Sequence, residues 1–367
     1  MRCGRGAGFW LAALTAAFWA VIPGFAADLK TAQDAFRTGD YSQAISLARL
    51  GVKAQPADEA WQLLLSRTLL RTGQYRQALA AMTNALAQNR WSIRLRWQAR
   101  EVFLSNGQGD AASQVPDTII GMVSRHPRDF SDAADLVVFG RAALTSGADP
   151  KRVLDSVFSA ALKAEPSLEA GYLASGELAL DKHDFALAAK RFDEAIKVLP
   201  DEPDLRWGLA RAYAPSDQAL MLNSLEQALN INSNHIPSLL LLAEHQIDAE
   251  DYPSAERLLA QVLKLNPWNP DAWAYRAVLA HLSNQPDPES RAREAGLKFW
   301  AANPRVDYLI GQKLSQNYRF SQGAAHQRQA LRFDPDFLPA KAQLAQDLLR
   351  LGSRTTLDTS TRFRRRT

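Results

Sequence analysis

The sequence has little that could perform bond-making chemistry or hold a metal. Cys3 is the single cysteine among 367 residues, which excludes a disulfide framework, a thiolate zinc site and a cysteine nucleophile in the folded part. No two of the six histidines stand four positions apart, as a helical HExxH zinc site requires. No GxSxG nucleophile elbow and no Walker A loop occurs. We therefore expect a protein that is not an enzyme, with no catalytic residue, no cofactor and no metal.

The central part of the chain also has no excess of positive charge. Its net charge is +4, but the segment 1–27 carries +2 and the segment 353–367 carries +4, so the segment 28–352 carries −2. A protein that binds nucleic acid needs clustered positive charge on its folded surface. The charge distribution therefore argues against nucleic acid as a partner.

The N-terminus has the composition of an export signal. Two arginines precede an uncharged apolar run over 9–22, and small residues stand three and one positions before Ala27. We predict a signal peptide over 1–26 and an exported protein, periplasmic or extracellular. The alternative is an uncleaved membrane anchor, because the apolar stretch over 9–25 reaches the lower limit of about 17 residues for spanning a bilayer.

A period of about 34 residues runs through the rest of the chain, and a period of this size indicates repeats that each contain two helices. The segment ALKAEP at 161–166 recurs as AIKVLP at 195–200, and GDYSQA at 39–44 recurs as GQYRQA at 73–78. An insertion is expected within 106–116, where glycine and proline cluster. After a first helix near 29–38, the copies are expected at 40–56, 59–90, 93–127, 129–166, 169–200, 203–233, 236–267, 270–304 and 305–335.

The pattern inside the copies resembles the tetratricopeptide repeat (TPR). In the best copy the family's aromatic, small and proline positions are occupied by Tyr172, Gly176, Phe185, Ala188, Phe192, Ala195 and Pro200. The resemblance implies an all-α fold, a right-handed TPR superhelical solenoid of about nine helix-turn-helix repeats over 27–352. Each helix pair buries its apolar stripe against its neighbours. The core positions are expected to include Ala44, Ala78, Gly176, Ala188, Phe192, Ala195, Ala243 and Ala255.

Some parts of the chain depart from this pattern. Arg100 replaces the small residue of the third copy. The segment 338–352 has the helical spacing of one more first helix, and no second helix follows. The segment 353–367 is rich in threonine and arginine and almost empty of aliphatic residues, so we predict a disordered basic tail. The alternatives are a segment read out of frame and a basic arm that binds phosphate or anionic lipid.

The segment FLPAKAQLAQDLLRLG at 337–352 is similar to one in large exported TPR proteins. In those proteins the array continues into a C-terminal peptidase-like domain with a zinc-binding HExxH helix. This resemblance implies an alternative in which the chain is the N-terminal part of a TPR-containing metallopeptidase-like protein. The catalytic residues would then lie beyond this chain.

In the TPR family the first helix of each pair faces a concave groove, which implies a protein or peptide as the partner. By repeat position, the groove candidates are Arg67, Arg71, Glu177, Asp181, Trp207, Arg211, Glu244 and Asp248. Trp207 and Arg211 stand at i and i+4 on one face, and both residue types are common in binding hot spots. The four acidic candidates form a stripe that would attract a basic segment. Ordinary packing and a solvated helix face are the alternatives.

These observations favour an exported, non-catalytic scaffold for protein–protein interaction that binds its partner in the groove. The family's carboxylate clamp needs lysine and asparagine on the groove helices, and Leu63, Arg67, Leu173 and Glu177 stand there instead. Chaperone C-terminal tails are therefore not favoured as ligands. A third possibility is an envelope-anchored assembly factor, which contacts a membrane only if the N-terminal segment is uncleaved.

Overall fold

The structure is a computed structural model that describes residues 28–352, and in this part every regular element is helical. The predicted signal peptide over 1–26 and the predicted tail over 353–367 lie outside the described residues. The elements are α1 (Leu29–Thr38), α2 (Tyr41–Ala54), α3 (Glu59–Arg71), α4 (Tyr75–Gln88), α5 (Ile93–Ser105), α6 (Gly109–Ser113), α7 (Val115–Arg125), α8 (Ala133–Thr145), α9 (Pro150–Arg152), the π-helix η1 (Val153–Phe158), α10 (Ser159–Ala164), α11 (Glu169–Asp181), α12 (Phe185–Val198), α13 (Pro203–Tyr213), α14 (Gln218–Ile231), α15 (Ile236–Asp248), α16 (Tyr252–Leu265), α17 (Pro270–Leu282), α18 (Pro286–Gly296), α19 (Pro304–Gln316), α20 (Phe320–Phe333) and α21 (Leu338–Arg350).

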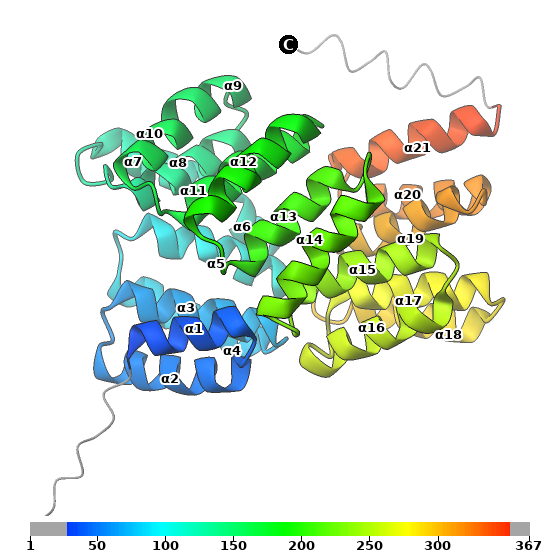
Figure 1. Ribbon diagram of the computed structural model, residues 1–367, viewed down its shortest axis with the longest axis horizontal. Coiled ribbons are helices and arrows are strands. Elements are labelled where there is room, and N and C mark those ends of the chain that lie inside the picture. The colour runs from blue at the N-terminus through cyan, green and yellow to red at the C-terminus, as the bar shows by residue number, and fades with distance from the viewer. Residues whose placement is uncertain (1–27, 353–367) are drawn as a thin grey trace, which may run out of the picture.

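Over the described residues these elements form nine repeats and one further helix, α21, which packs on α20 (Figure 1). The fold prediction of an all-α TPR solenoid with about nine repeats is confirmed. The first helices are α1, α3, α5, α8, α11, α13, α15, α17 and α19, and the remaining elements make up the second helices.

Several second helices begin directly after an aspartate that caps the N-terminus of the helix. The carboxylate oxygens of Asp40, Asp184, Asp217 and Asp251 each accept a hydrogen bond from the backbone N–H three positions on, at 3.0–3.1 Å. Such a cap satisfies one of the free N–H groups at the helix start, and a negative charge there is favoured by the helix dipole. The same short sequence signal therefore starts the second helix in four repeats.

Small residues allow the two helices of a repeat to approach closely. A methyl group added at Gly176 would lie 2.3 Å from Cζ of Phe192, and one added at Gly208 would lie 2.4 Å from the same ring. Phe192 is itself fully buried, so its ring fills the space between α11 and α13. The eight predicted core positions are all buried.

The third and fourth repeats are the irregular ones. The first helices α3 and α5 begin at positions 59 and 93, whereas α8 begins at 133 and α11 at 169, so the regular spacing is exceeded twice. The second helix of the third repeat is split into α6 and α7, and that of the fourth passes through the π-helix η1. The expected insertion within 106–116 therefore accounts for only part of the extra length. π-Helical turns are rare and occur mostly as single turns within an α-helix, as η1 does between α9 and α10.

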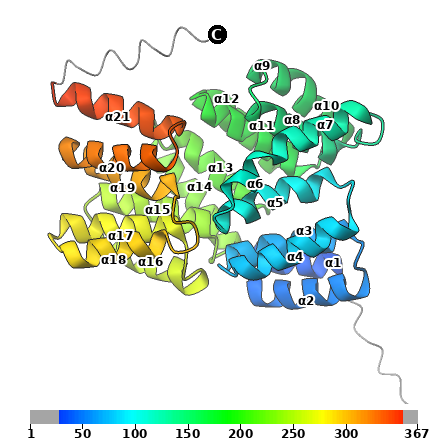
Figure 2. The same ribbon diagram turned by 180° about the vertical axis from the view of Figure 1, so that it is seen from behind.

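The array also contacts itself between repeats that are far apart in sequence. Figures 1 and 2 show α1–α4 beside the segment that contains α14 and α16. The amide Nδ2 of Asn232 donates to the hydroxyl of Tyr41 at 3.3 Å, and Nδ2 of Asn266 donates to the hydroxyl of Tyr75 at 3.0 Å. Each pair joins the turn inside one repeat to the loop between two later repeats, and we call these the cross-turn contacts.

A third cross-turn contact follows one repeat later. The turn at Gly107 lies against the backbone of Phe299, where an added methyl group would be 3.1 Å from the carbonyl oxygen. The Phe299 ring packs edge-on against Tyr75 at 5.1 Å and against Trp268 at 5.7 Å between ring centroids. The first three repeats are thus held against the sixth to ninth repeats by contacts that recur with the repeat period.

Candidate functional site

The inner face is the surface formed by the first helices, which pack on one another from each repeat to the next. All eight predicted groove residues lie on four of these helices, α3, α11, α13 and α15. The structure brings several of them into contact with charged residues of other repeats. The inner face is therefore a polar surface crossed by ion pairs.

The predicted Arg71 forms part of a cluster that joins α3 to α13 and α15. Its guanidinium lies 3.5 Å from the carboxylate of Asp204, which also accepts a hydrogen bond from Nε2 of His235 at 2.9 Å. Nδ1 of His235 in turn accepts from the hydroxyl of Ser238 at 2.7 Å. Burial by itself would raise the pKa of Asp204, but Arg71 and His235 outweigh it and hold the pKa well below its usual range. Burial is also the main reason that the pKa of His235 is lowered.

The same cluster contains a carboxyl group that the sequence did not single out. Burial, with the nearby charges of Asp204 and Glu202, raises the pKa of Glu169 to about 8, although Arg67 and Arg71 act in the opposite direction. Glu169 is the first residue of α11, where the helix dipole would otherwise favour its charge. No local pattern marks this residue, because its neighbours come from α3 and α13.

The other predicted arginine of α3 lies beside this cluster. Nε of Arg67 donates to Oε1 of Gln98 on α5 at 3.4 Å. Arg67 and Arg71 therefore serve contacts within the chain.

Trp207 and Arg211 are adjacent on α13, as their spacing predicts. The guanidinium carbon of Arg211 lies 4.8 Å from the centre of the Trp207 ring, within the range of a cation–π contact. Burial lowers the pKa of Arg211, and the charges of Glu177 and Asp181 partly offset this. Among the described residues Arg211 has no hydrogen bond or ion pair, so its N–H groups are available for a ligand.

The predicted acidic stripe is largely neutralised within the chain. Lys313 on α19 is fully buried and lies 2.8 Å from the carboxylate of Glu244 and 2.9 Å from that of Asp248. Glu177 is paired with Arg141 of α8 at 2.7 Å. Asp181 alone of the four has no hydrogen bond or ion pair within residues 28–352, and burial raises its pKa despite Arg211.

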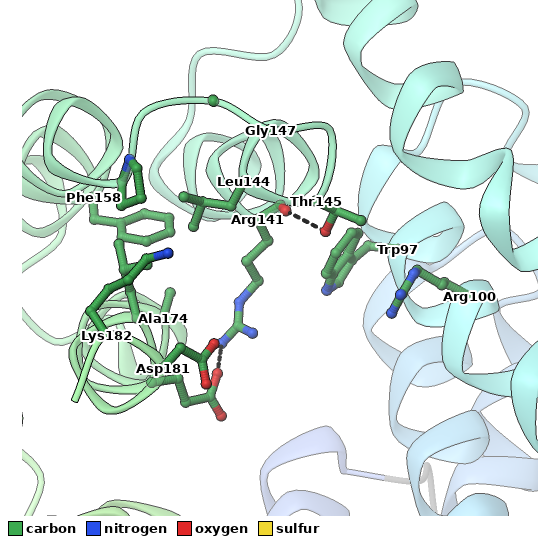
Figure 3. Close-up of a pocket in the computed structure, with 14 residues that line it drawn as sticks. Trp97, Arg100, Arg141, Leu144, Thr145, Gly147, Phe158, Ala174, Asp181 and Lys182 are labelled. Atoms are coloured by element: carbon green, nitrogen blue, oxygen red, sulfur yellow. Dashed lines mark hydrogen bonds and ion pairs between the residues drawn. The ribbon is translucent and has the colours of Figure 1, made fainter. Parts of the chain in front are cut away.

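A pocket of about 450 Å³ opens between α5 on one side and α8 and α11 on the other. Figure 3 shows Trp97 and Arg100 together on α5, across the pocket from Arg141 and Asp181. The pocket lies where the third and fourth repeats are longer than the others. It is lined by Trp97, Arg100, Arg141, Leu144, Thr145, Gly147, Ala148, Pro150, Phe158, Ala174, Glu177, Leu178, Asp181 and Lys182.

Two further findings bear on chemistry. The described part of the chain contains no cluster of three or more histidine, cysteine, aspartate or glutamate side chains arranged to hold a metal ion. Within the same part, none of the helices has the length and apolarity needed to cross a bilayer.

The geometry defines a helical-repeat protein whose first helices pack on one another and are joined by ion pairs between repeats. Two family models, both described as tetratricopeptide repeat, match residues 173–219 and 217–282. The chain therefore contains tetratricopeptide repeats, and its fold is the TPR solenoid.

A solved structure agrees with this fold. The crystal structure of the APC/C hetero-tetramer Cut9–Hcn1 aligns with a TM-score of 0.56 and 14% identity over 85% of this chain. The alignment covers 60% of that chain, so the present chain spans less than two thirds of its length. The crystal structure of yeast Tom70 aligns with a TM-score of 0.45 and 12% identity over 88% of each chain. No curated protein matches the sequence.

Proposed function

We propose that the chain is an exported, non-catalytic TPR scaffold that binds a protein or peptide partner on its inner face. The observation that carries the proposal is the Trp207–Arg211 pair, in which a half-buried indole and a guanidinium without an acceptor among the described residues share one helix face. An aromatic ring next to an unpaired cation is a typical hot-spot arrangement, because both groups gain contacts when a partner excludes water.

The inner face supplies two unpaired charges of opposite sign near this pair. Arg211 has no acceptor and Asp181 has no donor among the described residues, whereas Arg71, Glu177, Glu244 and Asp248 are paired within the chain. A partner that carries one acidic and one basic group close together would complement this surface. Paired charges on the inner face fix its shape and contribute less to binding.

The experiment is a pull-down with the purified full-length chain, followed by an affinity measurement for the captured protein. Replacing both Trp207 and Arg211 by alanine should weaken binding at least about tenfold, or about 1.4 kcal/mol. The matched control is Trp91→Ala, since Trp91 is exposed and lies in the loop before α5. Equal binding by the double variant and the wild type would remove this pair from the proposed site.

Export is tested at the N-terminus of the protein taken from cells. Mass spectrometry of the native chain should find a first residue near Ala27 in the periplasmic or secreted fraction. A chain that keeps its first residues and stays with the membrane fraction would support the alternative of an envelope-anchored assembly factor.

The N-terminal array of a metallopeptidase-like protein is the second candidate. It is favoured by α21, a first helix that packs on α20 and whose Leu338 and Leu349 side chains are 66% and 64% exposed. The downstream genomic DNA, read in all three frames, should then encode an HExxH helix and a third zinc ligand. An unrelated downstream sequence would refute this candidate.

A further inference from the structure

One position in the first helices is small in every repeat except one. At this position the first helix lies against its own second helix, as Gly176 shows against Phe192 and Gly140 against Phe158. Across the first helices and α21 this position is occupied by Ala32, Ser66, Arg100, Gly140, Gly176, Ala210, Ala243, Ala277, Gly311 and Ala345. Arg100 is thus the single large residue at a position where packing requires a small one.

Arg100 has no internal partner that explains this exception. Its Nε atom is buried and has no hydrogen-bond acceptor, and its guanidinium makes no ion pair within residues 28–352. Its one described contact is with the ring of Trp97, whose centre lies 5.6 Å from the guanidinium carbon. Arg141, across the pocket, is by contrast paired with Glu177.

A guanidinium held in this way is costly for the folded protein. A buried N–H group without an acceptor loses its hydrogen bonds to water and gains none in return. Burial also lowers the pKa of Arg100, and the charge of Glu101 only partly offsets this. Arg191 and Arg276 also have a buried Nε without an acceptor, but each makes an ion pair through its other nitrogens. Arg100 makes none within residues 28–352, so its unmet hydrogen-bonding capacity points to a ligand.

We propose that the pocket beside Arg100 binds a peptide carboxylate, with the guanidinium of Arg100 donating hydrogen bonds to it. The planar guanidinium matches a carboxylate with two parallel N–H···O bonds. Leu144, Phe158 and Leu178 line the pocket and provide an apolar wall for the group that carries the carboxylate. The volume of about 450 Å³ is within the range of small-ligand sites.

The charges that line the pocket select the charge of the ligand. Arg100, Arg141 and Lys182 supply three positive charges and Glu177 and Asp181 two negative ones, so the net charge of +1 matches a single carboxylate better than a phosphate with nearly two negative charges. This pocket adjoins the Trp207–Arg211 surface and shares Asp181 with it, but Arg100 itself lies on α5. The carboxylate proposal rests on the proposed function in one respect only, namely that the ligand is a peptide.

The test uses small probes, so that it does not depend on identifying the partner. Saturation-transfer NMR on the full-length chain would compare N-acetyl-leucine, which ends in a free carboxylate, with the neutral N-acetyl-leucinamide. N-acetyl-aspartic acid N-methylamide carries its carboxylate on the side chain and thereby distinguishes an internal acidic residue from a peptide C-terminus. A probe of this size is expected to bind with a Kd of about 1 mM.

Three variants complete the design. Arg100→Ala introduces the small residue found in other repeats, and should reduce binding of the carboxylate probe by at least about tenfold. Arg100→Lys keeps the charge but loses the planar guanidinium, so it should bind with intermediate affinity. Arg257→Ala changes an exposed arginine of α16 and should bind like the wild type.

The thermal midpoint separates a binding role from a structural one. Because Arg100→Ala removes a buried donor without an acceptor, its Tm should equal or exceed that of the wild type while probe binding is lost. Binding of the neutral amide as strong as that of the acid, undiminished binding by Arg100→Ala, or no binding of either acid by the wild type would overturn the proposal. These results are independent of the pull-down that tests Trp207 and Arg211.

Discussion

The hydroxyl of Tyr75 accepts a hydrogen bond from Nδ2 of Asn266 at 3.0 Å, although the two belong to repeats far apart in sequence. Asn266 is buried, and its Nδ2 also donates to the carbonyl of Leu70 at 3.4 Å, while its Oδ1 accepts from the backbone N–H of Trp268. One asparagine therefore fixes its own loop and joins it to the second repeat. Most contacts in a solenoid are between neighbouring repeats, and this one is not.

Asn266→Ala should lower the free energy of unfolding by about 1–3 kcal/mol, because it removes the hydrogen-bond partner of the buried Tyr75 hydroxyl and of the Trp268 N–H. Urea denaturation followed by circular dichroism measures this change. Asn223→Ala is the control, since Asn223 is exposed on α14, and it should change stability by less than about 0.5 kcal/mol. Equal effects of the two substitutions would mean that the cross-turn contact does not stabilise the fold.

Gly73→Ala tests the same contact from the other side. Gly73 has φ +71°, and an added Cβ would lie 2.2 Å from Oδ1 of Asn266. Gly147 has φ +91° with open space around it, so Gly147→Ala incurs only the cost of a left-handed conformation, about 1–2 kcal/mol. Gly73→Ala should be more destabilising by a further amount of about 1–3 kcal/mol, because the side chain also displaces Asn266.

The comparison of the two alanine variants isolates the steric effect, since both positions have the same kind of backbone strain. Small-angle scattering adds a second measurement, because a displaced Asn266 should increase the radius of gyration of Gly73→Ala but not of Gly147→Ala. Identical stabilities of the two variants would contradict the close approach at Gly73.

Glu169→Gln should stabilise the protein in a pH-dependent way. The pKa of Glu169 is raised from 4.5 to about 8 in the folded state, so between these values the folded protein retains a proton that the unfolded chain releases. The stability of the wild type therefore decreases as the pH rises through this range, and the contribution of Glu169 is fully lost above about pH 8. Glutamine resembles the protonated form and avoids the loss.

Unfolding free energies at about pH 5 and about pH 9 give the test. The advantage of Glu169→Gln over the wild type should be small at the lower pH and larger at the higher one. Asp193→Asn is a suitable control, because Asp193 is exposed on α12 away from the cluster. A constant difference at both pH values would show that Glu169 does not titrate abnormally.

Lys313→Met should destabilise the protein by about 1–2 kcal/mol, because Glu244 and Asp248, whose side chains are 27% and 45% exposed, lose their cation and are only partly rehydrated. Lys264→Met replaces an exposed lysine of α16 and should have little effect. Thermal unfolding of both variants at one salt concentration provides the comparison. A wild-type midpoint for Lys313→Met would show that the pair contributes nothing to stability.

The helix pairs and their core could be predicted from the sequence because each repeat buries its apolar stripe locally. Gly176 and Phe192 belong to the two helices of one repeat, and a contact of this kind recurs wherever the repeat pattern recurs. The Trp207–Arg211 contact was likewise predictable, since it depends only on helical spacing.

The cross-turn contacts and the ionic cluster could not be predicted in the same way. Arg71 on α3 lies close to Asp204 on α13 because of the combined rotation of the repeats between them. No local sequence pattern specifies that combined rotation. The pairing of Lys313 with Glu244 and Asp248 also joins different repeats. Arg100 was visible in the sequence as a departure from the repeat, but its lack of an acceptor among the described residues emerged only from the packing around it.

The cross-turn contacts make this array depend on its own number of units. A solenoid whose units interact only with adjacent ones tolerates the gain or loss of a unit, because every interface is preserved. Here Tyr41 and Tyr75 reach Asn232 and Asn266 only when the intervening segment has its present length. Deleting a single unit from the middle would leave the remaining helix pairs in place but would move these tyrosines away from their asparagines, so the array would lose the contacts that join its two ends.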